Sequence, residues 1–286
     1  MSQPKTIVIT GASDGIGAAA ARRLSAEGHR VVVIGRSRQK TEAVAAETGA
    51  DHYVTDFTRL DEVRALAAEL NSAYPRIDVL ANNAGGIFAR AGKTVDGFEQ
   101  TFQINHLAPF LLTRLLLDTL IASRATVIQT SSVGARMAGK LDLDDLDLDR
   151  NFDSLRAYNA AKLENILFTT ELHRRYHEQG IAAVAHHPGN VQTSFGSATD
   201  SRLIKFVIAI LSSPLVHRFL LLTPDKGAEQ LVWFARSTPG ADWTPGGYYE
   251  KGKPAKRTNP QAGDSDLARR LWDRSEDLLG LGAAAG

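Results

Sequence analysis

Tyr158 and Lys162 are the two residues whose types and spacing indicate chemistry most directly, because they stand four positions apart in a helix-forming stretch. Residues four apart on an α-helix lie one above the other, so a phenol and an ammonium can share one site. A free tyrosine has a pKa of about 10. A nearby positive charge favours the phenolate and lowers that pKa, which makes tyrosine a usable general acid or base. Solvent-exposed helix faces also carry such pairs, so the interpretation needs a second signal.

A glycine-rich turn near the N-terminus supplies that signal. The β-branched run 5–10 continues into G-A-S-D-G-I-G and then into an alanine-rich, helix-forming stretch. Strand, glycine turn and helix N-terminus are the context of a dinucleotide site, where the helix end offers N–H groups and a positive dipole to phosphates. We expect Gly11 to permit the turn, Gly15 to let the backbone approach a pyrophosphate, and Gly17 to let the helix pack on the strand. The spacing is G-x-x-x-G-x-G rather than G-x-G-x-x-G.

Three motifs follow one another in the order and rough spacing of a known family. They are Thr10–Gly17, the run N-N-A-G at 82–85, and Tyr158-x-x-x-Lys162. Together they resemble the short-chain dehydrogenase/reductase family over most of the chain. The stretch 158–172 and the C-terminal stretch 271–279 look like the retinol-dehydrogenase-like branch. The resemblance implies an oxidoreductase that transfers a hydride between a nicotinamide cofactor and an alcohol or carbonyl group.

The resemblance also implies four catalytic residues, namely Asn105, Ser132, Tyr158 and Lys162. Tyr158 would exchange a proton with the substrate oxygen, and Lys162 would lower the tyrosine pKa and hold the nicotinamide ribose. Ser132 would hydrogen-bond the substrate oxygen. Asn105 would orient a water that joins Lys162 to solvent. Ser131 is the alternative serine, but the family pattern places its serine directly before a short apolar-glycine turn, as Ser132 stands here.

The residues that the resemblance assigns to the cofactor come from the glycine turn, the ends of three strands and the loop after the sixth strand. Besides Tyr158 and Lys162 they are Gly11, Ser13, Asp14, Gly15, Ile16, Gly17, Arg36, Asp56, Asn83, Ala84, Gly85, Pro188, Gly189, Val191 and Thr193. Asp56 would accept a hydrogen bond from the adenine amino group, and helix capping is its alternative role. The loop from Pro188 to Thr193 would hold the nicotinamide carboxamide.

The choice between NAD and NADP depends on the end of the second strand. A carboxylate there would bond the ribose 2′-hydroxyl of NAD and repel the 2′-phosphate of NADP. The stretch V-I-G-R-S-R at 33–38 has no acid, and the Arg36 guanidinium suits a phosphate. Asp14 counts against this, since some NADP-using relatives have a basic residue there. We expect NADP, with NAD as the alternative.

Length and composition predict one large α/β domain, a Rossmann-type doubly wound parallel sheet of about seven strands flanked by helices. The chain has 286 residues, of which 43% are hydrophobic. The predicted elements are strands at 5–10, 30–35, 51–55, 77–82, 124–131, 181–186 and 247–249, and a C-terminal helix over 264–279. No internal repeat or linker divides the chain.

Charge and cysteine content limit the partners. With 33 basic and 32 acidic residues, the chain gives no reason to expect nucleic acid or an anionic membrane. The absence of cysteine excludes disulfides and thiolate metal sites. We expect no metal, a small-molecule carbonyl or alcohol partner, and no transmembrane segment. A cytoplasmic location is expected because the first strand begins too early for a signal peptide. A homodimer or homotetramer is left open.

Two segments depart from a minimal member of the family. The acidic stretch 142–149 follows the active serine, and we expect it to form a wall of the substrate cleft rather than a metal site. The apolar stretch 203–222, within a predicted lid over about 195–225, could be a substrate lid, a core helix or an interfacial membrane contact. Its uncharged run is shorter than the roughly 20 residues that span a bilayer. The leading hypothesis is an oxidoreductase with an apolar substrate; the alternative is a non-catalytic nucleotide-sensing or scaffold protein.

Overall fold

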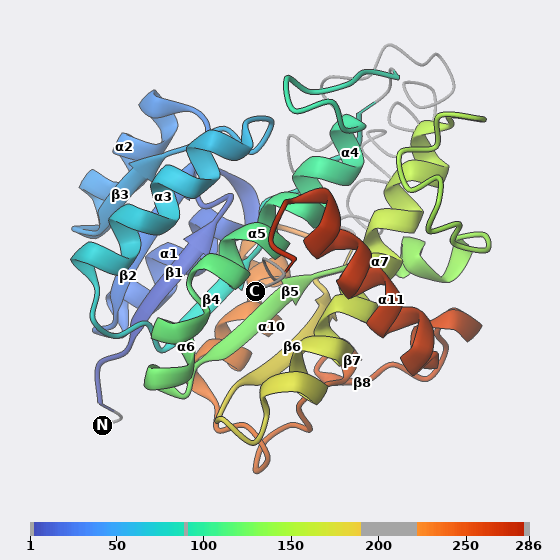
Figure 1. Ribbon diagram of the computed structural model, residues 1–286. Coiled ribbons are helices and arrows are strands. Elements are labelled where there is room, and N and C mark those ends of the chain that lie inside the picture. Colours follow the sequence, from blue (N-terminus) through green and yellow to red (C-terminus); the bar gives the residue numbers. More distant parts are fainter. Residues whose placement is uncertain (1–2, 89–90, 190–221, 283–286) are drawn as a thin grey trace, which may run out of the picture.

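The computed structural model describes residues 3–88, 91–189 and 222–282 of the chain (Figure 1). Its centre is an eight-stranded sheet in the order β3-β2-β1-β4-β5-β6-β7-β8. The strands are β1 Thr6–Thr10, β2 Arg30–Gly35, β3 Asp51–Val54, β4 Val79–Asn82, β5 Thr126–Thr130, β6 Ala182–His187, β7 Tyr248–Glu250 and β8 Lys253–Pro254. The predicted α/β class with a parallel, doubly wound sheet is confirmed.

The first seven strands run parallel, and β8 pairs antiparallel with β7. The central strands are apolar and buried on both faces, as parallel strands covered by helices must be. The strand order reverses between β1 and β4, so the crevice of the sheet lies at the carboxyl ends of these two strands. The sequence prediction missed β8, which follows β7 after Lys251 and Gly252, both with positive φ.

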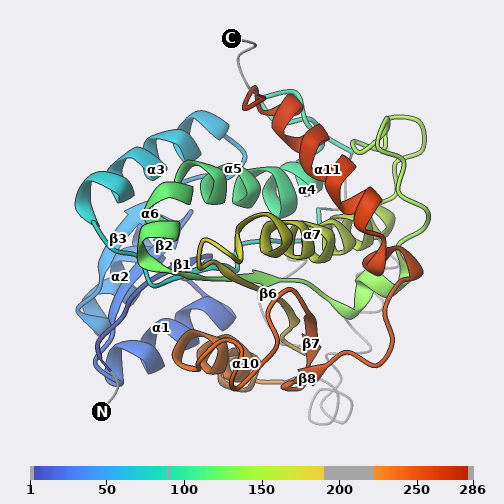
Figure 2. The same ribbon diagram turned by 60° about the horizontal axis from the view of Figure 1, so that its bottom comes forward.

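Helices cover both faces of the sheet. Figure 2 shows α1 and α10 below it and α3, α5 and α7 above it. The helices of the first face are α1 Gly15–Ala26, α2 Arg38–Thr48 and α10 Pro224–Arg236. Those of the second are α3 Leu60–Ala73, α4 Gln100–Phe102, α5 Ala108–Leu115, α6 Leu117–Ser123, α7 Ser154–Tyr176 and α11 Ser265–Leu278. Each face has its own apolar core.

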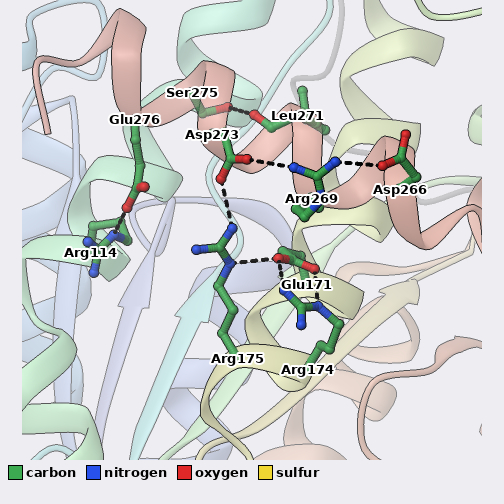
Figure 3. A network of polar contacts seen from close by, with 10 residues as sticks. All are labelled: Arg114, Glu171, Arg174, Arg175, Asp266, Arg269, Leu271, Asp273, Ser275 and Glu276. Atoms are coloured by element: carbon green, nitrogen blue, oxygen red, sulfur yellow. Dashed lines mark hydrogen bonds and ion pairs between the residues drawn. The ribbon is translucent and has the colours of Figure 1, made fainter. Parts of the chain in front are cut away.

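The C-terminal helix α11 forms an outer layer across α7, where the sequence predicts a helix over 264–279 (Figure 2). Trp272 is 1% exposed and stacks on Phe168 of α7 with ring centroids 5.6 Å apart. Figure 3 shows the ionic contacts around this packing. Arg114 of α5 bonds Glu276 at 2.8 Å, and Arg175 of α7 reaches Asp273 at 2.8 Å. The helix is therefore fixed to two neighbours by both apolar and ionic contacts.

Within the described residues, no single helix is long and apolar enough to cross a bilayer. The stretches Gln100–Leu115 and Leu117–Ser123 reach the required length and composition only together, and they are bent by 64° relative to each other. Most residues of α5 are buried, whereas α6 buries Leu117, Leu120 and Ser123.

Candidate active site

The glycine turn between β1 and α1 has the geometry of a dinucleotide cradle. Gly11 adopts a φ of 64°. A Cβ on Gly17 would lie 2.3 Å from the Gly11 carbonyl oxygen, so only glycine allows α1 to approach the strand this closely. Asp14 caps α1 by accepting the Gly15 N–H at 2.8 Å. The turn and the helix N-terminus thus fit the pyrophosphate of a dinucleotide.

Thr10 and Asn83 join this turn to the end of β4. The Thr10 hydroxyl oxygen accepts the backbone N–H groups of Asn83 and Ala84, each at 3.0 Å. The Asn83 side-chain amide donates in return to the Thr10 carbonyl at 3.0 Å. The predicted residues Asn83, Ala84 and Gly85 therefore lie beside the glycine turn at the switch point of the sheet. No sequence pattern indicated this role for Thr10.

Two basic side chains, Arg36 after β2 and Lys40 in the first turn of α2, lie next to the glycine turn. A Cβ on Gly35 would lie 2.5 Å from the Ser13 Cβ, so the end of β2 touches the turn. Arg36 follows at once and is exposed. Lys40, in the first turn of α2, places its ammonium 2.7 Å from the Asp14 carboxylate. The acidic residue that counted against NADP thus has a cation beside it.

Asn105 lies in a π-helical turn, Gln103–Leu107, rather than in a regular helix. Its side-chain amide donates to the Gly86 carbonyl at 2.9 Å and to the Thr101 carbonyl at 2.8 Å, and its oxygen accepts the Gly86 N–H at 3.2 Å. A Cβ on Gly85 would lie 2.5 Å from the Asn105 oxygen and 3.0 Å from Lys162 Nζ. The predicted partners Asn105 and Lys162 therefore meet on either side of Gly85. Such π-turns occur frequently at functional sites.

The two serines after β5 have different surroundings. Ser131 is buried, and its hydroxyl donates to the Lys162 backbone carbonyl at 2.6 Å. Ser132 is partly exposed and caps the short 3₁₀ helix Val133–Met137 by accepting the Gly134 N–H at 3.1 Å. Its side chain also hydrogen-bonds Tyr158 and favours the phenolate. Ser132, rather than Ser131, is thus the serine that reaches the tyrosine.

Lys162 and Tyr158 share one site, but their electrostatics differ from the expectation. Burial raises the pKa of Tyr158 to about 12, and the hydrogen bond with Ser132 only partly opposes it. Burial also lowers the pKa of Lys162 to about 7, so its positive charge is only partial near neutral pH. Its Nζ donates to the Thr130 carbonyl at 3.1 Å and lies 5.5 Å from the centre of the Tyr158 ring. Burial is thus the main influence on the Tyr158 pKa in this structure, and the lowering of that pKa by Lys162 stays a prediction.

The other predicted cofactor residues lie at the edges of the site. Asp56 accepts the Thr58 N–H at 2.9 Å in the turn before α3. The N-cap of α3 is Arg59, so Asp56 does not take the helix-capping role considered as its alternative. Pro188 and Gly189 follow β6, and Gly189 has a φ of 94°. Val191, Thr193 and almost all of the predicted lid lie outside the described residues.

The acidic stretch 142–149 packs against the catalytic helix. With Arg156, Ala160 and Glu164 of α7 it lines a small pocket with a free volume of about 10 Å³. Glu164 is 1% exposed, and burial next to Glu99 and Asp147 raises its pKa well above the ordinary value. Among the described residues, no group of three or more histidine or carboxylate side chains could hold a metal ion. Sequence patterns gave no signal that Glu164 would be buried.

Comparisons with known proteins agree with this geometry. The short chain dehydrogenase family profile matches residues 5–203. A candidate daunorubicin C-13 ketoreductase of Streptomyces sp. (strain C5), DnrU, is 39% identical, with 96% of this chain and 93% of the relative covered. Human retinol dehydrogenase 13 is 36% identical, covering 98% of this chain and 86% of the relative. The crystal structure of an uncharacterized protein from Mycobacterium paratuberculosis matches with a TM-score of 0.75 at 31% identity, over 96% of this chain and 93% of that one.

The chain therefore belongs to the short-chain dehydrogenase/reductase family, whose members are oxidoreductases acting on CH–OH or C=O groups. The similarity to retinol dehydrogenases confirms the resemblance drawn from the sequence.

Proposed function

We propose that this protein is an NADP-preferring alcohol dehydrogenase or carbonyl reductase with an apolar substrate. The observation that carries the proposal is the meeting of Ser132, Tyr158 and Lys162 at the carboxyl end of β5, beside a glycine turn that fits a dinucleotide. The nicotinamide, when bound, supplies or accepts the hydride. The chain's own residues bind the substrate oxygen and move the proton.

In the direction of reduction, Tyr158 donates its phenolic proton to the substrate oxygen as negative charge develops there. Its raised pKa keeps the phenol protonated near neutral pH, which suits the acid role. Ser132 donates a hydrogen bond to the same oxygen and stabilises the developing charge. Lys162, with Asn105 across Gly85, lies where a proton can be returned to the tyrosine.

Exposed apolar side chains close in sequence to the site residues support an apolar substrate. Met137, five residues after Ser132, is 66% exposed, and Leu155, three residues before Tyr158, is 50% exposed. Leu222 is 40% exposed, and its Cδ1 lies 2.4 Å from where a Cβ of Gly189 would be. Exposed large apolar residues near a site indicate a surface that binds apolar groups. Similarity to retinol dehydrogenases is consistent with such a substrate.

Two cations support the preference for NADP. Arg36 is exposed and, within the described part of the chain, makes no ion pair, so its guanidinium is available to a 2′-phosphate. Lys40 adds a second positive charge while it offsets that of Asp14. No carboxylate follows β2 to select a ribose hydroxyl. NAD is the alternative cofactor.

The experiment is a turnover assay with aldehydes, ketones and secondary alcohols, each with NADPH or NADH and the oxidised forms, on wild type and Tyr158→Phe. We expect Tyr158→Phe to lose kcat by about 10²–10⁴-fold, because general acid/base catalysis is worth that much. The cofactor Kd should change less than twofold, since the phenol moves the proton and holds little of the dinucleotide. A variant that keeps more than a tenth of wild-type kcat when chemistry limits the rate would contradict the assignment.

The alternative, a nucleotide-binding protein without catalysis, predicts cofactor binding but no turnover of any carbonyl or alcohol in wild type. The same assay therefore separates the two functions.

A further inference from the structure

The backbone carbonyl of Thr130 is an unusual acceptor, because it stands just beyond the end of a strand pairing. The ladder between β4 and β5 ends at Asn82 and Gln129. The next two N–H groups of the β4 side, from Asn83 and Ala84, bond the Thr10 hydroxyl instead. The Thr130 carbonyl therefore accepts hydrogen bonds from side chains of α7 rather than from the backbone of the β4 side.

Two of these side chains donate to the same oxygen. Lys162 Nζ donates at 3.1 Å, and the Asn165 side-chain nitrogen donates at 3.3 Å. A carbonyl oxygen has two lone pairs and can accept both. The two residues are three apart on α7, so they project from the same face of the helix. The carbonyl that holds the lysine is thus itself held by Asn165.

Asn165 lies in a buried, polar environment. Its side chain is 2% exposed, and its amide lies beside the ring of His106, whose protonated form it favours. His106 Nε2 is in turn 3.0 Å from the Ser275 hydroxyl of α11. The Ser131 hydroxyl donates to the Lys162 backbone carbonyl oxygen at 2.6 Å and so helps to fix the backbone of this residue. Leaving the Thr130 carbonyl would therefore cost Asn165 a buried hydrogen bond.

We infer that Asn165 is a positioning residue for the reaction: through the Thr130 carbonyl it fixes where the Lys162 ammonium lies relative to Tyr158. This inference rests on the role of Lys162 in the proposed function. Asn165 touches neither the reacting atoms nor the cofactor site, and it acts only through the lysine. This positioning role follows from the Thr130 carbonyl that Asn165 and Lys162 share as an acceptor, and no sequence motif indicates that contact.

The titration of Lys162 provides a measurement that does not depend on turnover. The ionisable groups facing its ammonium are Tyr158 on α7 and His186 on β6. Burial lowers the pKa of His186 to about 3, so this ring is neutral at the working pH. Placing a carboxylate at position 165 adds one opposite charge beside the lysine and should raise the lysine pKa.

The test compares Asn165→Leu, Asn165→Asp and the control Thr169→Val. Thr169 is fully buried one turn further along α7, and its hydroxyl donates only to the Asn165 backbone carbonyl at 2.8 Å. The control thus removes a buried polar group from the same helix without touching Thr130. The lysine pKa is followed by NMR of 13C-lysine-labelled protein, with the signal assigned by its loss in Lys162→Met.

We expect Asn165→Leu to lose kcat by about 10–100-fold, as displacements near 1 Å cost about 10²-fold, while the substrate KM changes less than twofold. Asn165→Asp should raise the Lys162 pKa by at least one unit, and Thr169→Val should leave both quantities at wild-type values. If Asn165→Leu does not fold, Asn165→Ser replaces it, because a serine hydroxyl is too short to reach the carbonyl.

The inference is overturned if Asn165→Leu, or Asn165→Ser in its place, keeps wild-type kcat. It is also overturned if the Lys162 pKa is unchanged in Asn165→Asp, or if Thr169→Val loses as much kcat as Asn165→Leu. If wild type shows no turnover, the proposed function fails, whereas the NMR titration still decides whether Asn165 and Lys162 are coupled.

Discussion

Gly85 offers a direct way to disturb the contact between Asn105 and Lys162 without removing either side chain. Its φ lies outside the left-handed region, so alanine is acceptable to the backbone. The added methyl carbon would, however, lie 2.5 Å from the Asn105 oxygen and 3.0 Å from Lys162 Nζ, where 3.4 Å or more is ordinary contact. Something must therefore move by about 0.9 Å.

The asparagine is held by three hydrogen bonds and is fully buried, so it cannot turn aside freely. Inserting a methyl group into such a packed site costs about 1–3 kcal/mol. We expect Gly85→Ala to lower the free energy of unfolding by that amount. Because displacing catalytic groups by about 1 Å costs on the order of 10²-fold, kcat should fall about 10–100-fold.

The assays are urea unfolding and steady-state turnover, with Gly263→Ala as the matched control. A Cβ on Gly263 meets no atom within 4 Å, so this change should alter stability by less than about 0.5 kcal/mol and leave kcat unchanged. The reasoning is refuted if Gly85→Ala is folded, binds cofactor and keeps kcat within twofold of wild type.

Three further predictions concern charge. Arg36→Asp should weaken NADPH binding about tenfold to a hundredfold, since a charged hydrogen bond is worth about 1.5–3 kcal/mol. Lys40→Met should weaken NADPH binding more than NADH binding. Equal Kd values of the wild-type protein for NADPH and NADH would refute the preference for NADP. Burial raises the pKa of Glu164, so the stability that this group contributes to the folded protein is present below pH 4.5, its ordinary pKa, and is lost as the pH rises. Glu164→Gln should therefore raise the free energy of unfolding by about 1–3 kcal/mol at pH 8 and leave it unchanged at pH 4. Burial lowers the pKa of His106 to about 3, so the stability that this group contributes to the folded protein is present above pH 6.5 and is lost as the pH falls. Between pH 7 and 4.5, the unfolding free energy of His106→Gln should fall less steeply than that of wild type. Parallel curves would count against a buried, neutral His106.

Local patterns in the sequence were sufficient for most of the fold. Buried parallel strands are short apolar runs, and glycine turns separate them from helices, so each of seven strands could be placed from its own residues. The hairpin to β8 was missed because a two-residue strand, Lys253–Pro254, has no apolar pattern of its own.

The candidate site was predictable where one motif carries the contact, and not where distant segments meet. The spacing of Tyr158 and Lys162 identified the pair, but spacing cannot show how deeply the pair is buried, and burial sets both pKa values. The contact of Lys40 with Asp14 joins residues 26 apart, and no pattern links them. Asn165 lacked a signal for the same reason, since its role depends on where a strand pairing ends.

The contact between His106 and Ser275 has a consequence for how the protein is made. The two residues are 169 positions apart, and Ser275 lies in the last helix of the described chain. At roughly 5–20 residues per second, a ribosome needs roughly 10–30 s to add the residues between them. During that time Phe110 and Phe168 lack the indole of Trp272 that later covers them. The nascent chain therefore presents this apolar surface to chaperones until α11 has been synthesised, and the turn that carries Asn105 receives its contact with Ser275 only then.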